Sequence, residues 1–217
     1  MASISPSTSA ILAVRELCFS RNDEPIFGPL SFVLRDGHAM LIEGDNGAGK
    51  TTLLRVLAGF LAPTSGVIEL DGASATWHAR SQRMSFLGHS SGLKADLTGL
   101  QNLRALLGIQ GQRNDRTLAQ AIARVGLEGF DDVPLRQLSA GQKKRMALAK
   151  LWLSPAKLWM LDEPYANLDL DGIALVNAMI AEHVAQMGSV MLTSHGAYAT
   201  PPVRTQTLRM EAPAVLA

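Results

Sequence analysis

The sequence predicts an α/β fold with a mainly parallel sheet and an inserted helical subdomain. Three observations lead to this prediction. Strand-like and helix-like segments alternate along the chain, a stretch from about residue 97 to 153 has helical spacing throughout, and a strand–loop–helix unit lies near residue 45. In folds of this class, ligands bind at the carboxyl ends of the parallel strands.

Size and composition fit one globular core. The 217 residues are 47% hydrophobic and 18% charged, and the formal net charge is +1. So small a net charge gives no electrostatic case for binding nucleic acid or an anionic membrane. The single Cys18 excludes an internal disulfide and suits a reducing compartment, and we expect it to be a small core residue.

We expect no signal peptide at the start of the sequence and no membrane-spanning segment in it. The first ten residues lack the basic segment of a signal peptide, and no apolar run reaches the roughly 18–20 residues that span a bilayer. We therefore expect a flexible tail over residues 1–10, one domain over residues 11–212 and a short tail over residues 213–217.

The first half of the chain is predicted to be mainly strands. Apolar and β-branched segments bounded by turn residues predict short strands, and a polar turn through residues 21–25 joins the first two. These predicted strands cover residues 14–19, 30–34, 67–70 and 84–87.

Helices dominate the middle of the chain. Thr98 and Gln101 form a plausible capping box at the start of one helix. Leu118, Ile122 and Val125 line one face of a second, and Pro134 interrupts the pattern before a third. The third helix is predicted to begin near residue 140, after which strands at 157–161 and 190–193 flank a helix at 173–186.

The strand–loop–helix unit carries the most specific motif. Residues 44–51 fit the phosphate-binding pattern G-x-x-x-x-G-K-[ST], between an apolar strand at 39–42 and a helical segment at 53–58. Glycines let backbone N–H groups approach the phosphates, Lys50 would reach the β- and γ-phosphates, and the Thr51 hydroxyl would ligate Mg²⁺. A glycine-rich turn without a ligand is disfavoured because both the spacing and the setting are complete. The predicted phosphate-binding residues are Gly44, Asp45, Asn46, Gly47, Ala48, Gly49, Lys50, Thr51 and Thr52.

Two adjacent carboxylates end the apolar strand at 158–161. Asp162 would hold Mg²⁺ through its water shell. Glu163 should point the other way, because strand side chains alternate, and could polarise the water that attacks the γ-phosphate. The simpler alternative is a strand followed by an acidic turn, which the upstream phosphate-binding motif makes less favoured.

Residues 138–142, Leu-Ser-Ala-Gly-Gln, identify the family. Alone they indicate a helix start, because Ser139 can cap and Gln142 can close a capping box. Their place some 20 residues before Asp162, with basic residues following, resembles the signature motif of ATP-binding-cassette (ABC) ATPases, with Ala140 in place of a glycine. The resemblance implies that Leu138, Ser139, Ala140, Gly141 and Gln142 face the γ-phosphate of ATP bound by a second copy.

Other family landmarks follow in order, from about Val14 to Leu208. Asn167, Leu168 and Asp169 occupy the D-loop position, and His195 resembles the switch histidine that contacts the γ-phosphate. The resemblance implies a P-loop NTPase of the ABC type, with an antiparallel β subdomain and a helical subdomain at about residues 90–153. ATP and Mg²⁺ are the implied cofactors.

Two positions depart from the common ABC pattern. His89 stands where the Q-loop glutamine is usual, and a neutral imidazole could accept a hydrogen bond from the attacking water or approach the metal. Arg21 stands where an aromatic side chain usually stacks on adenine, and a guanidinium plane can also stack on a base. The nearby Phe27 is expected in the core.

Several segments are similar to the ATPase subunit of the cytochrome c maturation system, a haem-exporter type of ABC protein. They are residues 42–55, 88–94, 138–142 and 149–164. The resemblance implies an ATP-hydrolysing subunit on the cytoplasmic face of the bacterial inner membrane, bound to integral-membrane subunits of that complex. It would couple hydrolysis to haem export or to release of the haem chaperone.

No haem site is expected in this chain itself. His38, His78 and His183 have no clustered setting, and we expect them on the surface. Alternatives remain within and outside the class. One is a small-cassette transporter for a drug, lipid or metal, and another is a soluble ABC switch protein acting on nucleic acid, which usually has two cassettes or a coiled coil. A P-loop kinase or GTPase leaves residues 138–142 unexplained.

Overall fold

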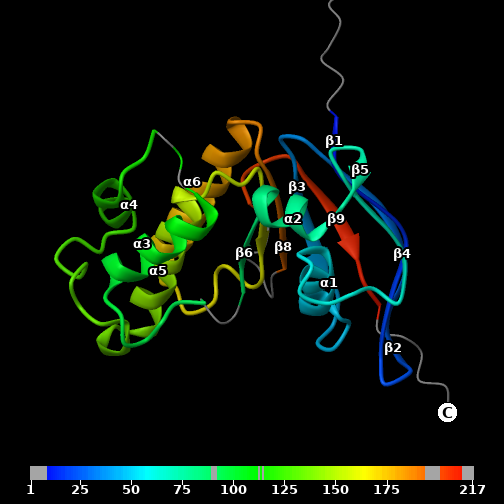
Figure 1. The fold of residues 1–217 in the computed structure, drawn as a ribbon, viewed down its shortest axis with the longest axis horizontal. Coiled ribbons are helices and arrows are strands. Elements are labelled where there is room, and N and C mark those ends of the chain that lie inside the picture. Colours follow the sequence, from blue (N-terminus) through cyan, green and yellow to red (C-terminus); the bar gives the residue numbers. More distant parts are fainter. Residues whose placement is uncertain (1–8, 89–91, 112, 114, 194–200, 212–217) are drawn as a thin grey trace, which may run out of the picture.

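The computed structural model describes residues 9–88, 92–111, 113, 115–193 and 201–211. Within them, a group of helices lies beside a parallel sheet, and an antiparallel sheet lies on the other side, as Figure 1 shows. The predicted α/β architecture with a parallel core and a helical insertion is confirmed, and so is the antiparallel β subdomain that the family resemblance implied.

The antiparallel sheet has the order β2-β1-β4-β5. Its two long strands form a hairpin whose turn is Asn22-Asp23, with φ of 52° and 64°. The two predicted strands and the turn within residues 21–25 are therefore confirmed, but both strands are longer than predicted, because Asn and Asp tolerate positive φ and let the strands run to a two-residue turn. The four strands are β1 (Ala10–Arg21), β2 (Glu24–Arg35), β4 (Ser65–Leu70) and β5 (Ala73–Ser74).

The second sheet is parallel at every strand pair of the described chain and has the order β6-β7-β8-β3-β9. Strand β9, a polar edge strand, escaped prediction because it lacks an apolar run. The strands are β3 (Ala39–Glu43), β6 (Met84–Leu87), β7 (Leu158–Leu161), β8 (Ser189–Thr193) and β9 (Thr205–Arg209).

Alternation along the parallel strands divides the core into two clusters. Met40 and Ile42 of β3 face helix α1 (Lys50–Leu57) and the antiparallel sheet, whereas Ala39 and Leu41 face the opposite cluster. Helix α1 is therefore enclosed between the two sheets, and its first residue lies at the carboxyl edge of β3 (Figure 1).

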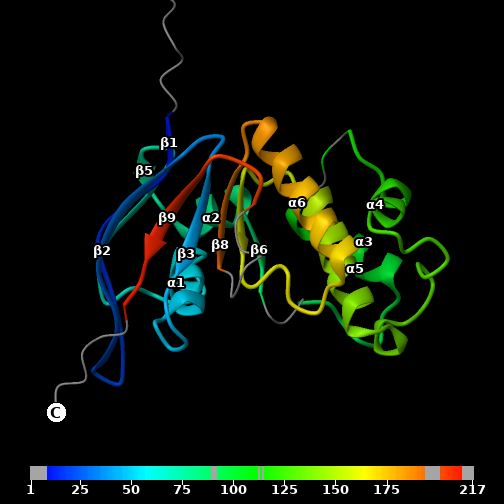
Figure 2. The same ribbon diagram turned by 180° about the vertical axis from the view of Figure 1, so that it is seen from behind.

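Helices cover the other face of the parallel sheet. α6 (Leu170–Ala185) packs against both β8 and α5, so that it lies between the sheet and the helical group, as Figure 2 shows from behind. It begins before the predicted residue 173 because Asp169 caps it. The remaining helices are α2 (Trp77–Arg83), α3 (Gly99–Gln110), α4 (Leu118–Arg124), the 3₁₀ helix η1 (Leu135–Gln137) and α5 (Ala140–Leu153).

Side-chain capping fixes where the inserted helices begin. The capping box predicted at Thr98 and Gln101 is confirmed, and a second forms at Thr117 at the start of α4. The third is the one predicted for Ser139, whose hydroxyl accepts a hydrogen bond from the backbone N–H of Gln142 at 3.2 Å. Residue 140 is thus the first residue of α5, as the sequence indicated.

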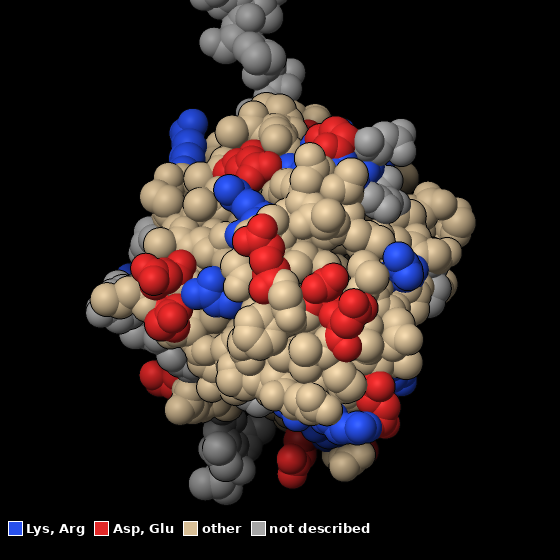
Figure 3. Space-filling view, turned by 90° about the vertical axis from the view of Figure 1, so that its left-hand side faces the viewer, with Lys and Arg blue, Asp and Glu red and all other residues tan. Residues whose placement is uncertain are grey.

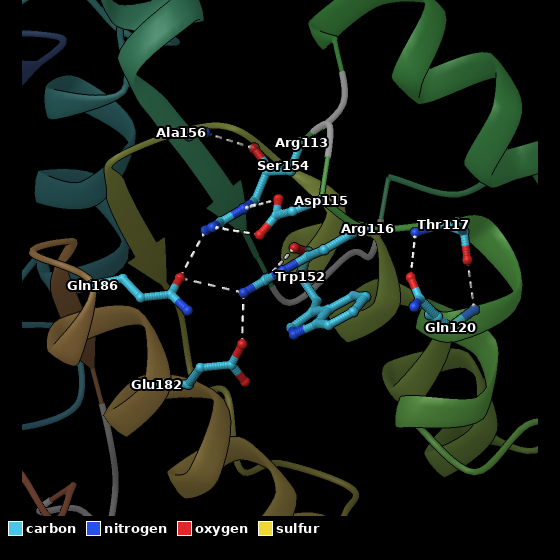
Figure 4. A network of polar contacts seen from close by, with 10 residues as sticks. All are labelled: Arg113, Asp115, Arg116, Thr117, Gln120, Trp152, Ser154, Ala156, Glu182 and Gln186. Carbon is cyan, nitrogen blue, oxygen red and sulfur yellow. Dashed lines mark hydrogen bonds and ion pairs between the residues drawn. The ribbon is translucent and has the colours of Figure 1, made fainter.

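A buried arginine ties the helical subdomain to α6. Arg116, only 6% exposed, donates to Glu182 Oε1 and to the Trp152 carbonyl, each at 2.6 Å. Its guanidinium carbon lies 4.1 Å from the centre of the Trp152 ring (Figure 4). Arg113 adds a 2.9 Å hydrogen bond to Gln186. Charge-assisted bonds of this kind hold the loop before α4, the end of α5 and α6 together.

The histidine prediction was wrong for two of its three residues. His78 is exposed, but His38 and His183 are buried at 9% and 6% exposure. The His183 ring stacks on Trp159 at 3.9 Å between centroids, and its Nε2 lies 3.0 Å from the Lys157 carbonyl oxygen. Burial lowers the pKa of His183 from 6.5 to about 4.

This depressed pKa predicts a loss of stability in mild acid. Folding keeps the His183 ring neutral. The ring therefore adds to the free energy of unfolding in full above pH 6.5, and this contribution is lost as the pH falls toward 4. Between pH 7 and pH 4.5 the wild-type free energy of unfolding should fall by about 2 kcal/mol more than that of His183→Phe. Denaturant titrations at both pH values measure this, with His78→Gln as an exposed-histidine control that should match the wild type. Equal losses in wild type and His183→Phe would contradict the assignment.

None of the helices in the described ranges is long and apolar enough to cross a membrane.

Candidate functional site

A cavity of about 370 Å³ opens at the carboxyl edge of the parallel sheet. The loop between β3 and α1, the ends of β7 and β8, and one residue of β2 surround it. This is where the fold class places a ligand. The lining residues are Ile26, Asp45, Asn46, Gly47, Ala48, Gly49, Lys50, Thr51, Thr52, Asp162, Glu163 and Thr193.

The loop before α1 needs glycine at two close approaches. At Gly44, with φ of 153°, an added Cβ would lie 2.3 Å from the Met210 carbonyl oxygen. At Gly49, with φ of 87°, it would lie 3.1 Å from Ile26. Gly49 is also the N-cap of α1, and no side chain caps this helix. The first N–H groups of α1 therefore remain available to an anion in the cavity.

The Lys50 side chain folds into the same loop. It is 7% exposed, and its Nζ donates to the carbonyl oxygens of Gly44 and Asp45, the latter at 3.0 Å. A positive charge is thus fixed beside the uncapped helix end. Both features favour a polyanion such as a triphosphate.

Three strand and helix ends meet at the Asp162 carboxylate. Thr51 Oγ1 and Thr193 Oγ1 each donate to Asp162 Oδ1 at 2.9 Å, and Asp162 is 3% exposed. A hydroxyl and a carboxylate this close fit Mg²⁺, which takes one or two protein oxygens and completes its shell with waters and phosphates. The described residues hold no larger group of metal-binding side chains, and His89, proposed as a further ligand, lies outside them.

Glu163 does not alternate away from Asp162 as predicted. Strand β7 ends at Leu161, and Glu163 takes the left-handed conformation with φ of 48°. Asp162 and Glu163 consequently line the same cavity, with Glu163 half-buried. The strand rule failed because it was applied beyond the strand.

The segment at residues 138–142 does not line this cavity. Ser139 and Gln142 cap α5 at a separate place, so one chain does not bring the two motifs together at one cavity. The segment instead contacts the loop at 167–169: a Cβ on Gly141 would lie 3.2 Å from the Asn167 carbonyl oxygen. Asp169 caps α6 and accepts from Arg145 Nη2 at 3.0 Å, and its bonds from the Gly172 N–H and Arg145 lower its pKa.

Other predicted residues lie apart from the cavity or outside the described chain. Arg21 is exposed at the end of β1 and does not line the cavity, and Phe27 is buried as expected. His89 and His195 fall outside the described residues. Sequence reasoning did not single out two lining residues. Thr193 could have been found as a polar residue ending a parallel strand, but nothing in the sequence marks Ile26.

A second cavity, of about 630 Å³, lies around α2 and the ends of α1 and α3. It is lined in part by Phe60 and Trp77, which are 55% and 63% exposed, and by the cations Arg80 and Lys150. Aromatic side chains exposed to this extent mark a surface that a partner can cover.

Charge gives no comparable signal on the helical face. Figure 3 shows acidic and basic side chains interspersed among uncharged ones, without a broad area of a single sign. A face of this kind gives no electrostatic reason to bind a nucleic-acid backbone.

Comparison with known proteins shows which family this chain resembles. A family model described as ABC transporter matches residues 27–166. The cytochrome c biogenesis ATP-binding export protein CcmA of Xanthomonas axonopodis is 59% identical over 201 residues, covering 93% of this chain and 94% of that protein. The protein of the same name in Xylella fastidiosa strain 9a5c is 47% identical over 209 residues, covering 95% and 94%.

The fold has solved counterparts as well. A structure titled as the ATP binding subunit of an ABC transporter superposes with a TM-score of 0.85 over 94% of this chain and 88% of that chain. Its identity is only 22%, so the match supports the fold alone. The sheets, the cavity and the sequence motifs thus agree on one family of proteins.

Proposed function

Because this chain belongs to the ABC transporter family, and within it to the cytochrome c biogenesis ATP-binding export proteins, we propose that it is the ATP-hydrolysing subunit of a membrane complex for c-type cytochrome biogenesis. Its work would be coupled to haem export or to release of a haem-loaded chaperone. The names of these relatives, and the similarity over almost the whole length of both proteins, support this assignment.

One observation carries the ATPase part of the proposal: Lys50, Thr51, Asp162 and Glu163 surround a single cavity beside an uncapped helix. Residues 44–52 would bind the phosphates, with Lys50 neutralising their charge. Thr51 and Asp162 would hold Mg²⁺, which would stabilise negative charge on the phosphate oxygens when bound. Glu163 would polarise the attacking water. His89 and His195 are proposed to act at the same site, His89 near the metal and water and His195 at the γ-phosphate, and Arg21 is proposed to stack on adenine.

A second copy of the chain is proposed to complete each site. Ser139, Gly141 and Gln142 lie at a helix start that does not face the chain's own cavity. A helix N-terminus is suited to face a phosphate, so this segment would contact the nucleotide of the opposite copy. Closing on ATP and opening after hydrolysis would provide the mechanical step.

The partners are proposed to be the integral-membrane subunits of the cytochrome c maturation complex, which would hold this chain at the cytoplasmic face of the inner membrane. The exposed aromatic residues of the second cavity offer a surface for such contact. We propose that haem is handled by the membrane partners and not by this chain.

Complementation tests the proposal directly. In a bacterium whose own copy of this gene is deleted, the wild-type chain should restore all covalently bound haem on membrane cytochromes. Glu163→Gln, produced at the same level, should restore none. Haem-dependent peroxidase staining of membrane proteins after denaturing electrophoresis measures the outcome.

A deletion strain with normal c-type cytochromes, and no second copy of the gene, would leave an ABC ATPase acting on another cargo. Co-purification from detergent-solubilised membranes then separates the alternatives. Membrane subunits would indicate a different transporter, and ribosomes or DNA would indicate a soluble switch protein.

A further inference from the structure

The start of α5 touches the loop after β7 through consecutive side chains. Lys144, in the second turn of α5, donates from Nζ to the Glu163 carbonyl oxygen at 3.0 Å. Its neighbour Arg145 donates to Asp169 at 3.0 Å, further along the same loop. Since α5 begins with Ser139–Gln142 and the loop begins with Asp162–Glu163, these bonds join the two functional segments within one chain.

The backbone of Glu163 is held by hydrogen bonds on both sides of its Cα. Its N–H donates to Thr193 Oγ1 at 2.9 Å, and its carbonyl accepts from Lys144. Glu163 needs such support because its φ of 48° is unfavourable for a residue with a side chain. A backbone in this conformation persists only where its surroundings fix it, and the direction of the carboxylate depends on it.

Lys144 is an unusual residue to bury. It is 9% exposed, and burial lowers the pKa of its ammonium, opposed by the nearby carboxylates of Asp162 and Glu163. A buried cation is costly unless its partners compensate it. Its position beside two carboxylates also reduces the repulsion between them at the strand end.

We propose that Lys144 is a positioning residue for the hydrolytic step: it fixes the Glu163 peptide and thereby links the segment 139–142 to the carboxylate of the same chain. This rests on the proposed function, in which Glu163 polarises water and Ser139–Gln142 contact the nucleotide of the second copy. Nucleotide bound against the start of α5 would then stabilise the hydrolytic geometry of the other site through Lys144.

The test replaces Lys144 with methionine, which keeps the apolar stem and removes the donor. We expect kcat to fall by about 10- to 100-fold, with KM and ATP affinity within about 3-fold of wild type, because a misplaced catalytic group slows chemistry without affecting binding. Lys144→Gln retains a shorter N–H donor and should lose only about 3- to 10-fold. The control Lys143→Met changes the adjacent lysine, whose backbone N–H donates to the Ser139 carbonyl oxygen but whose side chain has no hydrogen bond or ion pair within the described chain, and it should match wild type.

A double-mutant cycle distinguishes positioning from a general effect on structure. If Lys144 acts through Glu163, adding Lys144→Met to Glu163→Gln should change the residual single-turnover rate by less than about 2-fold. If Lys144→Met acted only through a general loss of structure, it would lower the single-turnover rate by the same factor in the wild-type chain and in Glu163→Gln. If Lys144→Met fails to fold, the same cycle is run with Lys144→Gln.

Several outcomes overturn the inference. One is wild-type kcat in folded Lys144→Met, and another is an equal loss in the presence and absence of Glu163. Failure of the proposed function looks different, because Glu163→Gln alone would then retain wild-type turnover. A Glu163→Gln variant that is inactive beside a fully active Lys144→Met variant rejects only the role of Lys144.

Discussion

Glu163→Gln is expected to reduce ATP turnover by about 10²- to 10⁴-fold while leaving ATP affinity within about 3-fold of wild type. Glutamine keeps the shape of the side chain but is a far weaker base, so the water loses its polarising group. Binding should survive because Lys50, Thr51 and the uncapped start of α1 provide it. Phosphate release in the steady state and equilibrium binding of a fluorescent ATP analogue separate the two effects.

Glu128→Gln is the matched control, because it makes the same chemical change at an exposed site away from the cavity. It should retain wild-type turnover. Undiminished hydrolysis by Glu163→Gln would remove Glu163 from the reaction and leave a different group to polarise the water.

The parallel sheet illustrates what sequence periodicity can predict. Strands β6, β7 and β8 are short apolar runs between turn residues, and they lie where the pattern placed them, to within about a residue. Strand β9 is polar and at the edge, so it has no buried face to impose such a run. At the turn, the hairpin of β1 and β2 extends further than predicted because Ser20 and Arg21 of β1 still pair with β2.

The site divides in a similar way. The phosphate-binding loop and Asp162 could be predicted because their chemistry depends on local spacing and on a strand end. The left-handed backbone of Glu163 could not, because tertiary contacts from Thr193 and Lys144 hold it. Ile26 was likewise hidden, since it reaches the cavity from the other sheet.

The buried His183 shows both what periodicity can predict and where it stops. His183 follows Val176, Met179 and Ile180 on the buried face of α6, whereas α2, which holds the exposed His78, has no buried residue. Beyond the helix, an added Cβ on Gly188 would lie 2.3 Å from the His183 ring, and the Trp159 ring of β7 stacks on it. The contact with Trp159 joins segments distant in sequence, and no local pattern shows it.

Because the phosphate-binding loop and residues 139–142 lie apart in one chain, dimers that mix two different variants should show a large effect on ATP turnover. Ser139→Arg places a bulky side chain at the start of α5, and Lys50→Ala removes the phosphate-binding cation, so each homodimer should be nearly inactive. A mixed dimer combines the intact phosphate-binding loop of one chain with the intact α5 start of the other. It should therefore hold one functional site, with about half the wild-type turnover per dimer if the two sites act independently.

The mixed dimer is obtained by co-expressing the two chains with different tags together with the membrane subunits and purifying the doubly tagged complex. Its turnover is compared with that of a dimer pairing wild type with a chain carrying both changes, in which neither site is intact. If the sites are shared and act independently, the dimer of Ser139→Arg with Lys50→Ala is active. If the sites are shared but must act together, the dimer of wild type with the doubly changed chain is inactive. If the first dimer stayed inactive while the second kept the activity of its wild-type chain, each chain would have to complete its own site. The separation of Ser139–Gln142 from the cavity would then have to be closed by movement within one chain.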